Sequence, residues 1–271
     1  MKTTIKKLIP RPIGNGLRRI YLYFRGVVYS GKLYFCPICQ GSFKSMLEGG
    51  FDLPINYEKK IIGAGKRKNM VCPGCASTDR ERLLYTYLNN SPGLLKPLVK
   101  VLHIAPERGL SKYLNNISKS NYISGMKYHE GFYYGKTSRL FDIQELPFEN
   151  NQFELVVCNH VLEHVQDDRK AMTELYRVMQ PGATAILQVP WSPVIEETIE
   201  DPSIKDPKER EKKFGQFDHV RLYGHDYPKR LANAGFEVDT VTLEKLNIQL
   251  KYQQKISVIP NEVIFIAKKP V

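Results

Sequence analysis

Apolar runs alternate with amphipathic stretches over most of the chain after residue 75. Runs typical of strands occur at 98–105, 121–126, 137–143, 153–160, 183–190, 236–243 and 262–269. Between them, helical periodicity appears at 109–116, 167–182 and 226–235. The run FELVVCNH at 153–160 is apolar almost throughout, as a strand buried on both faces of a parallel sheet should be. The alternation predicts an α/β fold: a Rossmann-like, doubly wound sheet of seven mostly parallel strands.

Two helices carry recognisable start and stop signals. One is predicted over 76–90, with an apolar face, and the other over 167–182, where Pro181-Gly182 should end it. Candidate N-caps are Ser77, Thr78 and Asp79 for the first helix and Asp167 and Asp168 for the second.

Length and composition restrict the class of protein. The 271 residues allow one large α/β domain with a small appendage, and 42% hydrophobic and 25% charged residues are ordinary for a globular protein. No segment approaches the roughly 18 uncharged apolar residues of a membrane span. Arg25 interrupts the only apolar run near the start, which argues against a cleaved signal peptide. We therefore expect a cytoplasmic protein without a transmembrane segment.

The net charge of +12 is concentrated at the beginning of the chain. Residues 1–35 contain eight Lys and Arg residues, no acidic residue, and the aromatic and aliphatic run IYLYF at 20–24. Such a segment suits peripheral contact with the anionic inner face of a membrane. It equally suits a phosphate backbone, and a solvated basic arm is the third interpretation.

Four of the five cysteines form two Cys-Pro-x-Cys pairs, Cys36/Cys39 and Cys72/Cys75. Such tight turns bring both thiolates of a pair to one ion, so two pairs predict a closed, structural four-cysteine Zn²⁺ site. We expect a hairpin between them. A CxxC redox centre is the competing interpretation, and disulfides are disfavoured in a cytoplasmic chain. Cys158 lies in an apolar run and reads as a core residue.

These features divide the chain into three parts. The predicted parts are a basic N-terminal arm at 1–33, a zinc-ribbon-like module at 34–78, and an α/β domain at 79–271 with an insertion at 191–225.

The segment FDIQELPFENNQFELVVCNHVLEHVQDDRKAMTELYRVMQPGATAILQVP carries a family likeness. Together with the rest of 98–269 it resembles the class I methyltransferases that depend on S-adenosylmethionine (SAM). The likeness extends to a subgroup with paired CPxC motifs, an HIAPE turn and a late FDHVRLYGHDYPKRL segment. It implies a SAM site at the carboxyl ends of the strands.

The resemblance assigns cofactor roles position by position. Asp142 matches the carboxylate that binds the adenine amino group, Ile143 a backbone contact, and Gly109 the last glycine of the cofactor loop. Asn159 borders the methyl-transfer pocket. In the stretch VLHIAPERG, however, His103 replaces an acidic residue, and Ala105 and Glu107 replace glycines. The ribose carboxylate is also missing: Met126-Lys127 stands in its place. The implied cofactor set is His103, Ala105, Glu107, Gly109, Met126, Asp142, Ile143 and Asn159.

The carboxylate of Glu107 has two interpretations. In the first, it replaces a polar contact to the positively charged cofactor that position 103 or the second strand has lost. In the second, it only caps the next helix. Glu130 is another candidate for the missing acid.

Histidines supply the candidate bases. His160 follows the strand that borders the implied pocket and is the first candidate, with His219 as the second, whereas His164 suits a structural role. Insertions at 191–225 commonly cover the substrate in such folds. His219, Arg221, Tyr223 and His225 would then form a polar wall, in which Arg221 could hold a phosphate or carboxylate.

The predicted function is methyl transfer to an oxygen or nitrogen of a small-molecule or glycan-type substrate. The alternative is an RNA methyltransferase, since zinc knuckles also accompany ribosomal RNA guanine methyltransferases, although no Asn-Pro-Pro-Tyr-type motif follows the fourth strand. The second alternative is a non-catalytic Rossmann-like scaffold, suggested by the altered loop.

Overall fold

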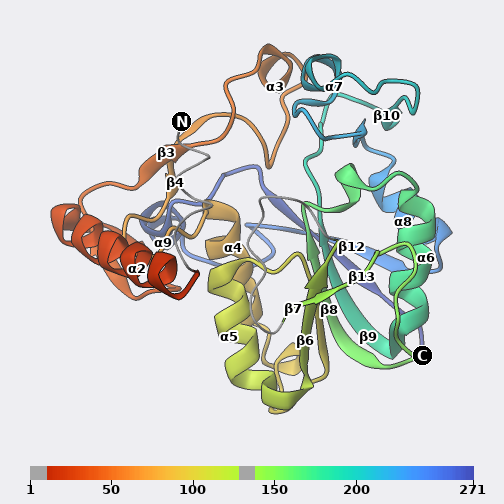
Figure 1. Ribbon diagram of the computed structural model, residues 1–271, viewed down its shortest axis with the longest axis horizontal. Helices are drawn as coiled ribbons and strands as arrows, with labels where there is room; N and C mark the ends of the chain where they lie inside the picture. Colours follow the sequence, from red (N-terminus) through yellow and green to blue (C-terminus); the bar gives the residue numbers. More distant parts are fainter. Residues whose placement is uncertain (1–10, 128–137) are drawn as a thin grey trace.

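A computed structural model describes residues 11–127 and 138–271 of the chain. Its centre is a seven-stranded sheet with the order β12-β13-β9-β8-β5-β6-β7 (Figure 1). The strands are β5 (Val101–Ile104), β6 (Tyr122–Met126), β7 (Ser138–Leu140), β8 (Phe153–Asn159), β9 (Met179–Gln188), β12 (Glu237–Thr242) and β13 (Val263–Lys268). The predicted doubly wound, seven-stranded fold is confirmed.

Strand direction decides where a ligand can bind. β5 pairs in parallel with both β6 and β8, while β7 and β9 continue the parallel set on either side. β13 is antiparallel to its neighbours β9 and β12. The strand order reverses between β5 and β8, so the ligand-binding crevice of such a sheet lies where these strands end. We call the end at which β5, β6, β7, β8 and β9 finish the carboxyl edge.

Helices cover both faces of the sheet (Figure 1). Along β8, Leu155 and Val157 pack with α4 (Asp79–Asn89) and α5 (Arg108–Ser118). The alternate residues Val156 and Cys158 pack with α6 (Asp168–Val178) and α8 (Tyr227–Asn233). This two-sided burial explains why the sequence of β8 is apolar without alternation, and Cys158 is the core residue that its surroundings predicted.

The helix predicted to end at Pro181-Gly182 is shorter than expected. α6 ends at Val178, and β9 begins at the next residue, Met179. Met179 is fully buried and pairs with Phe153 at the start of β8. Sheet pairing of these apolar residues therefore ends the helix a turn before the Pro-Gly stop signal.

α4 begins with a complete capping box. The Thr78 hydroxyl accepts from the backbone N–H of Glu81, and the Glu81 carboxylate accepts from the backbone N–H of Thr78. Of the three candidate caps, Thr78 is therefore the N-cap. One turn on, the buried Arg82 donates to five backbone carbonyls, two of them on Ile256 and Ser257. Arg82 thus ties α4 to α9 (Leu250–Ile256).

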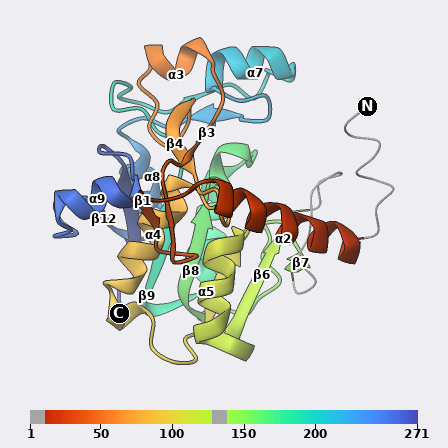
Figure 2. The same ribbon diagram turned by 90° about the vertical axis from the view of Figure 1, so that its left-hand side faces the viewer.

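The N-terminal part forms a separate small layer beside α4 and α5 (Figure 2). It consists of α2 (Arg11–Val28), β1 (Ser30–Cys36), β2 (Gly41–Phe43), β3 (Leu47–Gly49), α3 (Pro54–Glu58) and β4 (Arg67–Val71). β1 pairs with β2, and β3 pairs with β4, all antiparallel. The hairpin expected between the cysteine pairs is thus β3–β4, with α3 inserted between its strands.

The insertion after β9 contains β10 (Ile199–Glu200), α7 (Pro207–Phe214) and β11 (Arg221–Leu222). α7 lies beside α3 at the top of both views (Figures 1 and 2), and Ile61, Ile195, Phe214 and Leu222 form a small shared core between them. Short 3-10 turns complete the structure at Pro92–Leu94, Lys119–Asn121 and Leu162–His164, the last labelled η3. Within the described residues, no helix is both long and apolar enough to cross a bilayer.

Candidate functional site

The loop after β5 keeps a glycine-like backbone although its glycines are replaced. Ala105 has a φ of +47°, in the left-handed region, and its N–H donates to the Gly125 carbonyl on β6 over 2.8 Å. A residue with a Cβ pays about 1–2 kcal/mol for this conformation. The hydrogen bond to β6 therefore helps to hold Ala105 in a backbone conformation that glycine adopts more readily.

His103, Glu107 and Asn159 form one hydrogen-bonded group at the carboxyl edge. Nε2 of His103 lies 2.8 Å from one carboxylate oxygen of Glu107, and the Asn159 amide donates to the other over 2.9 Å. Nδ1 of His103 faces the hydroxyl of Tyr122 on β6 at 3.0 Å. Three neighbouring strands, β5, β6 and β8, thus position a single carboxylate.

The Glu107 carboxylate is not a helix cap. Glu107 occupies the N-cap position of α5, but its side chain makes no capping hydrogen bond. Burial acts to raise its pKa, yet the hydrogen bond and charge of His103 and the bond from Asn159 outweigh burial and hold the pKa below its usual value. Glu107 is therefore ionised near pH 7 and 26% exposed, so it can accept a further hydrogen bond.

Gly109 meets the N-terminal layer. A Cβ at this position would lie 2.9 Å from Ile38 and 3.1 Å from a carboxylate oxygen of Glu81. Burial, together with the nearby charge of Glu107, raises the pKa of Glu81 to about 7. A carboxyl group of α4 and a residue between two cysteines therefore lie against the first turn of α5.

Asp142 lies just after β7 and is partly exposed. Its carboxylate lies 2.7 Å from Nζ of Lys127 and accepts from the backbone N–H of Gln144. Burial acts to raise its pKa, but Lys127 and Gln144 together lower it. The lysine that follows β6, where the family has a carboxylate, therefore neutralises the predicted adenine ligand.

The remaining cofactor candidates are backbone or core positions. Ile143 is buried, and Met126 ends β6, where its carbonyl accepts from Phe141 N–H over 3.3 Å. The candidate Glu130 lies outside the described residues. The structure thus gathers the Glu107 group near the ends of β5 and β8, and Asp142 with Met126 at the neighbouring ends of β6 and β7.

The comparison with known proteins identifies the domain. Residues 109–187, from the cofactor loop to β9, match the family described as the methyltransferase domain. This part of the chain therefore resembles a methyltransferase domain. Its strand order, with an antiparallel β13 between β9 and β12, is that of the Rossmann-like class I methyltransferases expected from the sequence.

Curated relatives match the chain over short segments. A 2-phytyl-1,4-naphtoquinone methyltransferase of Nostoc punctiforme is 39% identical over 46 residues, which are 17% of this chain and 20% of the relative. A demethylmenaquinone methyltransferase of Lactiplantibacillus plantarum is 44% identical over 41 residues, 15% of this chain and 17% of the relative. The matches therefore span about a fifth of the length of these relatives.

Solved structures show a wider but weaker likeness to the chain. A SAM-dependent methyltransferase from Archaeoglobus fulgidus is 16% identical, with a TM-score of 0.45, over 72% of this chain and 96% of the other.

His160, the first candidate base of the methyltransferase domain, has a φ of +53° directly after β8. Arg80 donates to its Nε2 over 2.6 Å, and its Nδ1 lies 3.3 Å from Glu163. Burial, followed by the charge of Arg80, lowers the pKa of His160 to about 4. The ring is therefore neutral near pH 7, and its basic nitrogen is already occupied.

The second candidate base, His219, lies in a different group of side chains. It is buried and lies close to Glu163 and His164. Sequence reasoning assigned no role to Glu163, because one glutamate in a helical turn gives no sign of its burial. The chain therefore brings His164 and His219 together from η3 and the insertion.

The predicted polar wall is not open in this structure. Arg221 is buried and donates to the backbone carbonyls of Leu162, Val165 and Gln166. Tyr223 is fully buried, and its hydroxyl donates to Asp168 over 2.8 Å. His225 is exposed beside the Pro193 carbonyl. Arg221 and Tyr223 thus fasten the insertion to η3 and α6 rather than present free polar groups.

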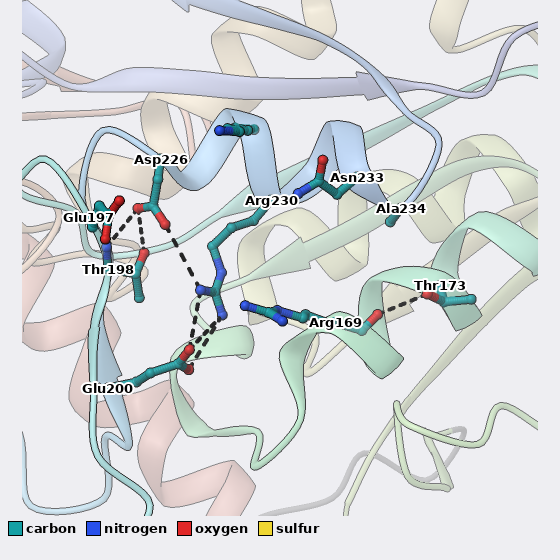
Figure 3. Close-up of a pocket in the computed structure, with 10 residues that line it drawn as sticks. Arg169, Thr173, Glu197, Thr198, Glu200, Asp226, Arg230, Asn233 and Ala234 are labelled. Atoms are coloured by element: carbon teal, nitrogen blue, oxygen red, sulfur yellow. Dashed lines mark hydrogen bonds and ion pairs between the residues drawn. The ribbon is translucent and has the colours of Figure 1, made fainter.

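A cavity of about 480 Å³ lies between α6, β10 and α8 (Figure 3). Part of its charged wall is already paired: Arg230 lies 2.8 Å from Asp168 and 3.3 Å from Glu200. None of the predicted cofactor residues lines it. The lining residues are Arg169, Thr173, Glu197, Thr198, Glu200, Asp226, Lys229, Arg230, Asn233 and Ala234.

The four predicted metal-binding cysteines converge. The sulfur atoms of Cys36, Cys39, Cys72 and Cys75 all lie within 4.8 Å of one another, and the pairs Cys36–Cys75 and Cys39–Cys72 are 3.7 Å apart. A tetrahedral zinc ion with bonds of about 2.3 Å needs sulfur–sulfur distances of about 3.8 Å. The donor set and its spacing fit a closed zinc site.

Proposed function

We propose that the protein is a SAM-dependent methyltransferase that acts on an oxygen or nitrogen atom of a small-molecule acceptor. The observation that carries the proposal is the match of residues 109–187 to the methyltransferase domain, in a sheet with Glu107 and Asp142 at its carboxyl edge. An ionised carboxylate there suits a cofactor that carries a sulfonium and an ammonium group.

For methyl transfer, the protein mainly has to position the acceptor atom against the methyl group of the cofactor. The acceptor lone pair forms a bond to the methyl carbon while the carbon–sulfur bond breaks, and its electron pair stays on sulfur as a neutral thioether. A hydroxyl or amine acceptor also loses a proton to a base or to water. With Nε2 of His160 occupied by Arg80, a second group must assist this proton loss.

The two quinone methyltransferases named above support a small-molecule acceptor. The quinone relatives favour a small acceptor that contains a ring. A saccharide is the second candidate acceptor. The basic N-terminal segment supports a location at the cytoplasmic face of a membrane.

The four-cysteine cluster supports a structural Zn²⁺ ion. A closed shell of four sulfur ligands leaves no position for a substrate, so the ion would hold the N-terminal layer together rather than take part in methyl transfer.

The first test is a calorimetric titration of the zinc-replete protein with S-adenosylhomocysteine. We expect binding with a Kd on the order of micromolar, weakened roughly 10- to 100-fold by Asp142→Ala and by Glu107→Gln, because each variant removes a charged hydrogen-bond acceptor. Asp239→Ala is the matched control, since it removes a similar ion pair, 2.8 Å to Lys245, on the far strand β12.

No binding to the wild-type protein would refute the proposal and favour the scaffold interpretation. If Asp142→Ala alone weakens binding, the cofactor site stands but Glu107 has no part in it.

A further inference from the structure

Glu163 is buried without a hydrogen-bond partner at the end of β8. It lies in η3 (Leu162–His164), its side chain is 1% exposed, and neither carboxylate oxygen accepts a hydrogen bond from the described residues. A charge removed from water in this way is costly unless a positive partner compensates it. Histidine nitrogens of His160 and His164 lie 3.3 and 3.9 Å from this carboxylate, but its oxygens stay free to bind a cation.

Two histidines complete the surroundings of this carboxylate. The ligand atoms of Glu163, His164 and His219 all lie within 4.8 Å of one another. His219 comes from the insertion, and the next residue, Val220, donates its N–H to the Glu163 carbonyl over 2.9 Å. The insertion is thus fastened so that its histidine faces the turn after β8.

The outer nitrogen of each histidine is already engaged. Nδ1 of His164 lies 3.2 Å from the Asp218 carboxylate, and Nδ1–H of His219 donates to the Phe214 carbonyl over 3.1 Å. Among the described residues, Nε2 of neither ring takes part in a hydrogen bond, and that of His164 lies 3.9 Å from Glu163. Histidines that bind metals typically donate their other N–H to a carboxylate or carbonyl in this way.

An ordinary ion-pair cluster would look different. Histidines that served as charged partners of Glu163 would donate to it, and neither His164 nor His219 does so. Nδ1 of His160 lies 3.3 Å from Glu163 without hydrogen-bond geometry, and its Nε2 accepts from Arg80. The cluster therefore offers one carboxylate and two lone-pair nitrogens to a common point.

We propose that Glu163, His164 and His219 bind one divalent first-row transition-metal ion. Bonds of about 2.0–2.2 Å place ligand atoms about 3 to 4 Å apart, close to the separations found here. Two imidazoles with one carboxylate favour Zn²⁺, Fe²⁺, Mn²⁺ or Co²⁺ over Mg²⁺ or Ca²⁺. Three protein ligands leave at least one position open, and His164 is 30% exposed on the solvent side.

This site extends the proposed function and rests on it for its role. Glu163 follows His160 by three residues, and an ion bound to Glu163 could bind an acceptor hydroxyl in its open coordination position. A bound metal lowers the pKa of such an oxygen and would supply the activation that the occupied His160 does not. The substrate class narrows to acceptors with an oxygen that can ligate a metal.

The test is a Co²⁺ titration, monitored by calorimetry and visible absorption, of protein that carries Zn²⁺ only in the four-cysteine site. We expect one Co²⁺ per chain, with the absorption of nitrogen and oxygen ligands and without a thiolate charge-transfer band. Glu163→Gln and His219→Ala should each weaken binding by at least tenfold. Asp218→Asn should weaken it roughly 10- to 100-fold through the orientation of His164. His225→Ala, an exposed histidine of the same insertion, is the matched control and should leave binding unchanged.

A wild-type protein that binds no Co²⁺ would overturn the proposal, as would unchanged affinity in both Glu163→Gln and His219→Ala. S-adenosylhomocysteine titration of the same samples separates the two proposals, and circular dichroism shows that the samples are folded. Binding of S-adenosylhomocysteine without binding of Co²⁺ rejects only the metal site. Binding of Co²⁺ without binding of S-adenosylhomocysteine rejects only the methyltransferase proposal.

Discussion

At the scale of single residues, buried carboxylates differ in how they are compensated. Glu107 is held by His103 and Asn159, and Glu81 belongs to the capping box of α4. Glu262, just before β13, has neither: it is 2% exposed, and both of its oxygens lack a hydrogen-bond partner among the described residues. Its burial therefore acts on stability without compensation by a hydrogen bond.

Glu262 should make the protein less stable at alkaline pH. Burial, supported by the charge of Asp79 and opposed by Arg80 and Arg67, raises its pKa from 4.5 to about 7. The folded protein thus holds this proton more tightly than the unfolded chain does. The stabilisation is complete below pH 4.5 and is lost as the pH rises through 7. Glu262→Gln should gain up to about 3 kcal/mol in unfolding free energy at pH 9 relative to its effect at pH 4.

Urea unfolding of both proteins at the two pH values measures this difference. Glu237→Gln, which changes an exposed carboxylate on β12, should show no such dependence on pH. The same unfolding free-energy change at pH 4 and pH 9 would contradict the assignment.

At the scale of elements, α2 is a helix with one anchored side. Arg25 donates to the carbonyls of Pro73 and Cys72, and Gly26 closely approaches Gly74 of the second cysteine pair. The other side is open, because seven large apolar side chains are 53–68% exposed: Leu17, Ile20, Tyr21, Tyr23, Phe24, Val27 and Val28. With no acidic residue in 1–35, this helix has the character of one that lies in an anionic membrane surface.

We expect the protein to sediment with vesicles that contain anionic phospholipid and much less with phosphatidylcholine alone. The double variant Tyr23→Ser, Phe24→Ser should bind roughly 10- to 100-fold more weakly, because it removes two aromatic side chains from the apolar face. Leu250→Ser on α9 removes an equally exposed apolar residue elsewhere and should have no effect. No binding to either vesicle type would leave α2 as a solvated arm.

At the scale of the whole molecule, the N-terminal layer and the insertion meet above the carboxyl edge (Figure 1). Ile62 forms a β-bridge with Trp191, and Arg80 connects the Gly63 carbonyl to His160. Ile38, between the first two cysteines, contacts the position of Gly109. The cysteine cluster is therefore coupled to the loop that the methyltransferase family uses for its cofactor.

Removal of zinc should consequently disturb more than the N-terminal layer. Among the described residues, the apolar cluster there has four buried members, Cys36, Phe43, Met46 and Cys72, and a cluster of this size gives little stability without a metal. We expect one Zn²⁺ per chain in the wild-type protein and less in Cys72→Ser. That variant should lower the unfolding midpoint by at least about 6 °C and weaken S-adenosylhomocysteine binding.

Metal analysis and thermal unfolding measure both effects. Cys158→Ser is the control, because Cys158 lies in the core of the large sheet and should keep the full zinc content. A zinc-free wild-type protein with the same unfolding midpoint would contradict a structural role for the metal.

The sequence by itself determined the seven strands, the helices between them, the cap region of α4 and the convergence of four cysteines. Each depends on local information: apolar periodicity, capping residues and paired CPxC turns. The end of α6 was misplaced because pairing of Met179 with Phe153 overrides a local stop signal.

Only the tertiary structure decided which polar residues are free to act. Arg221 and Tyr223 looked like a substrate wall in the sequence, but partners distant along the chain bury them. The sequence did not single out Glu163. In the folded chain His219 lies beside it, and its carboxylate has no hydrogen-bond partner among the described residues. Burial and long-range hydrogen bonding depend on the packing of separate elements, and local sequence patterns do not encode that packing.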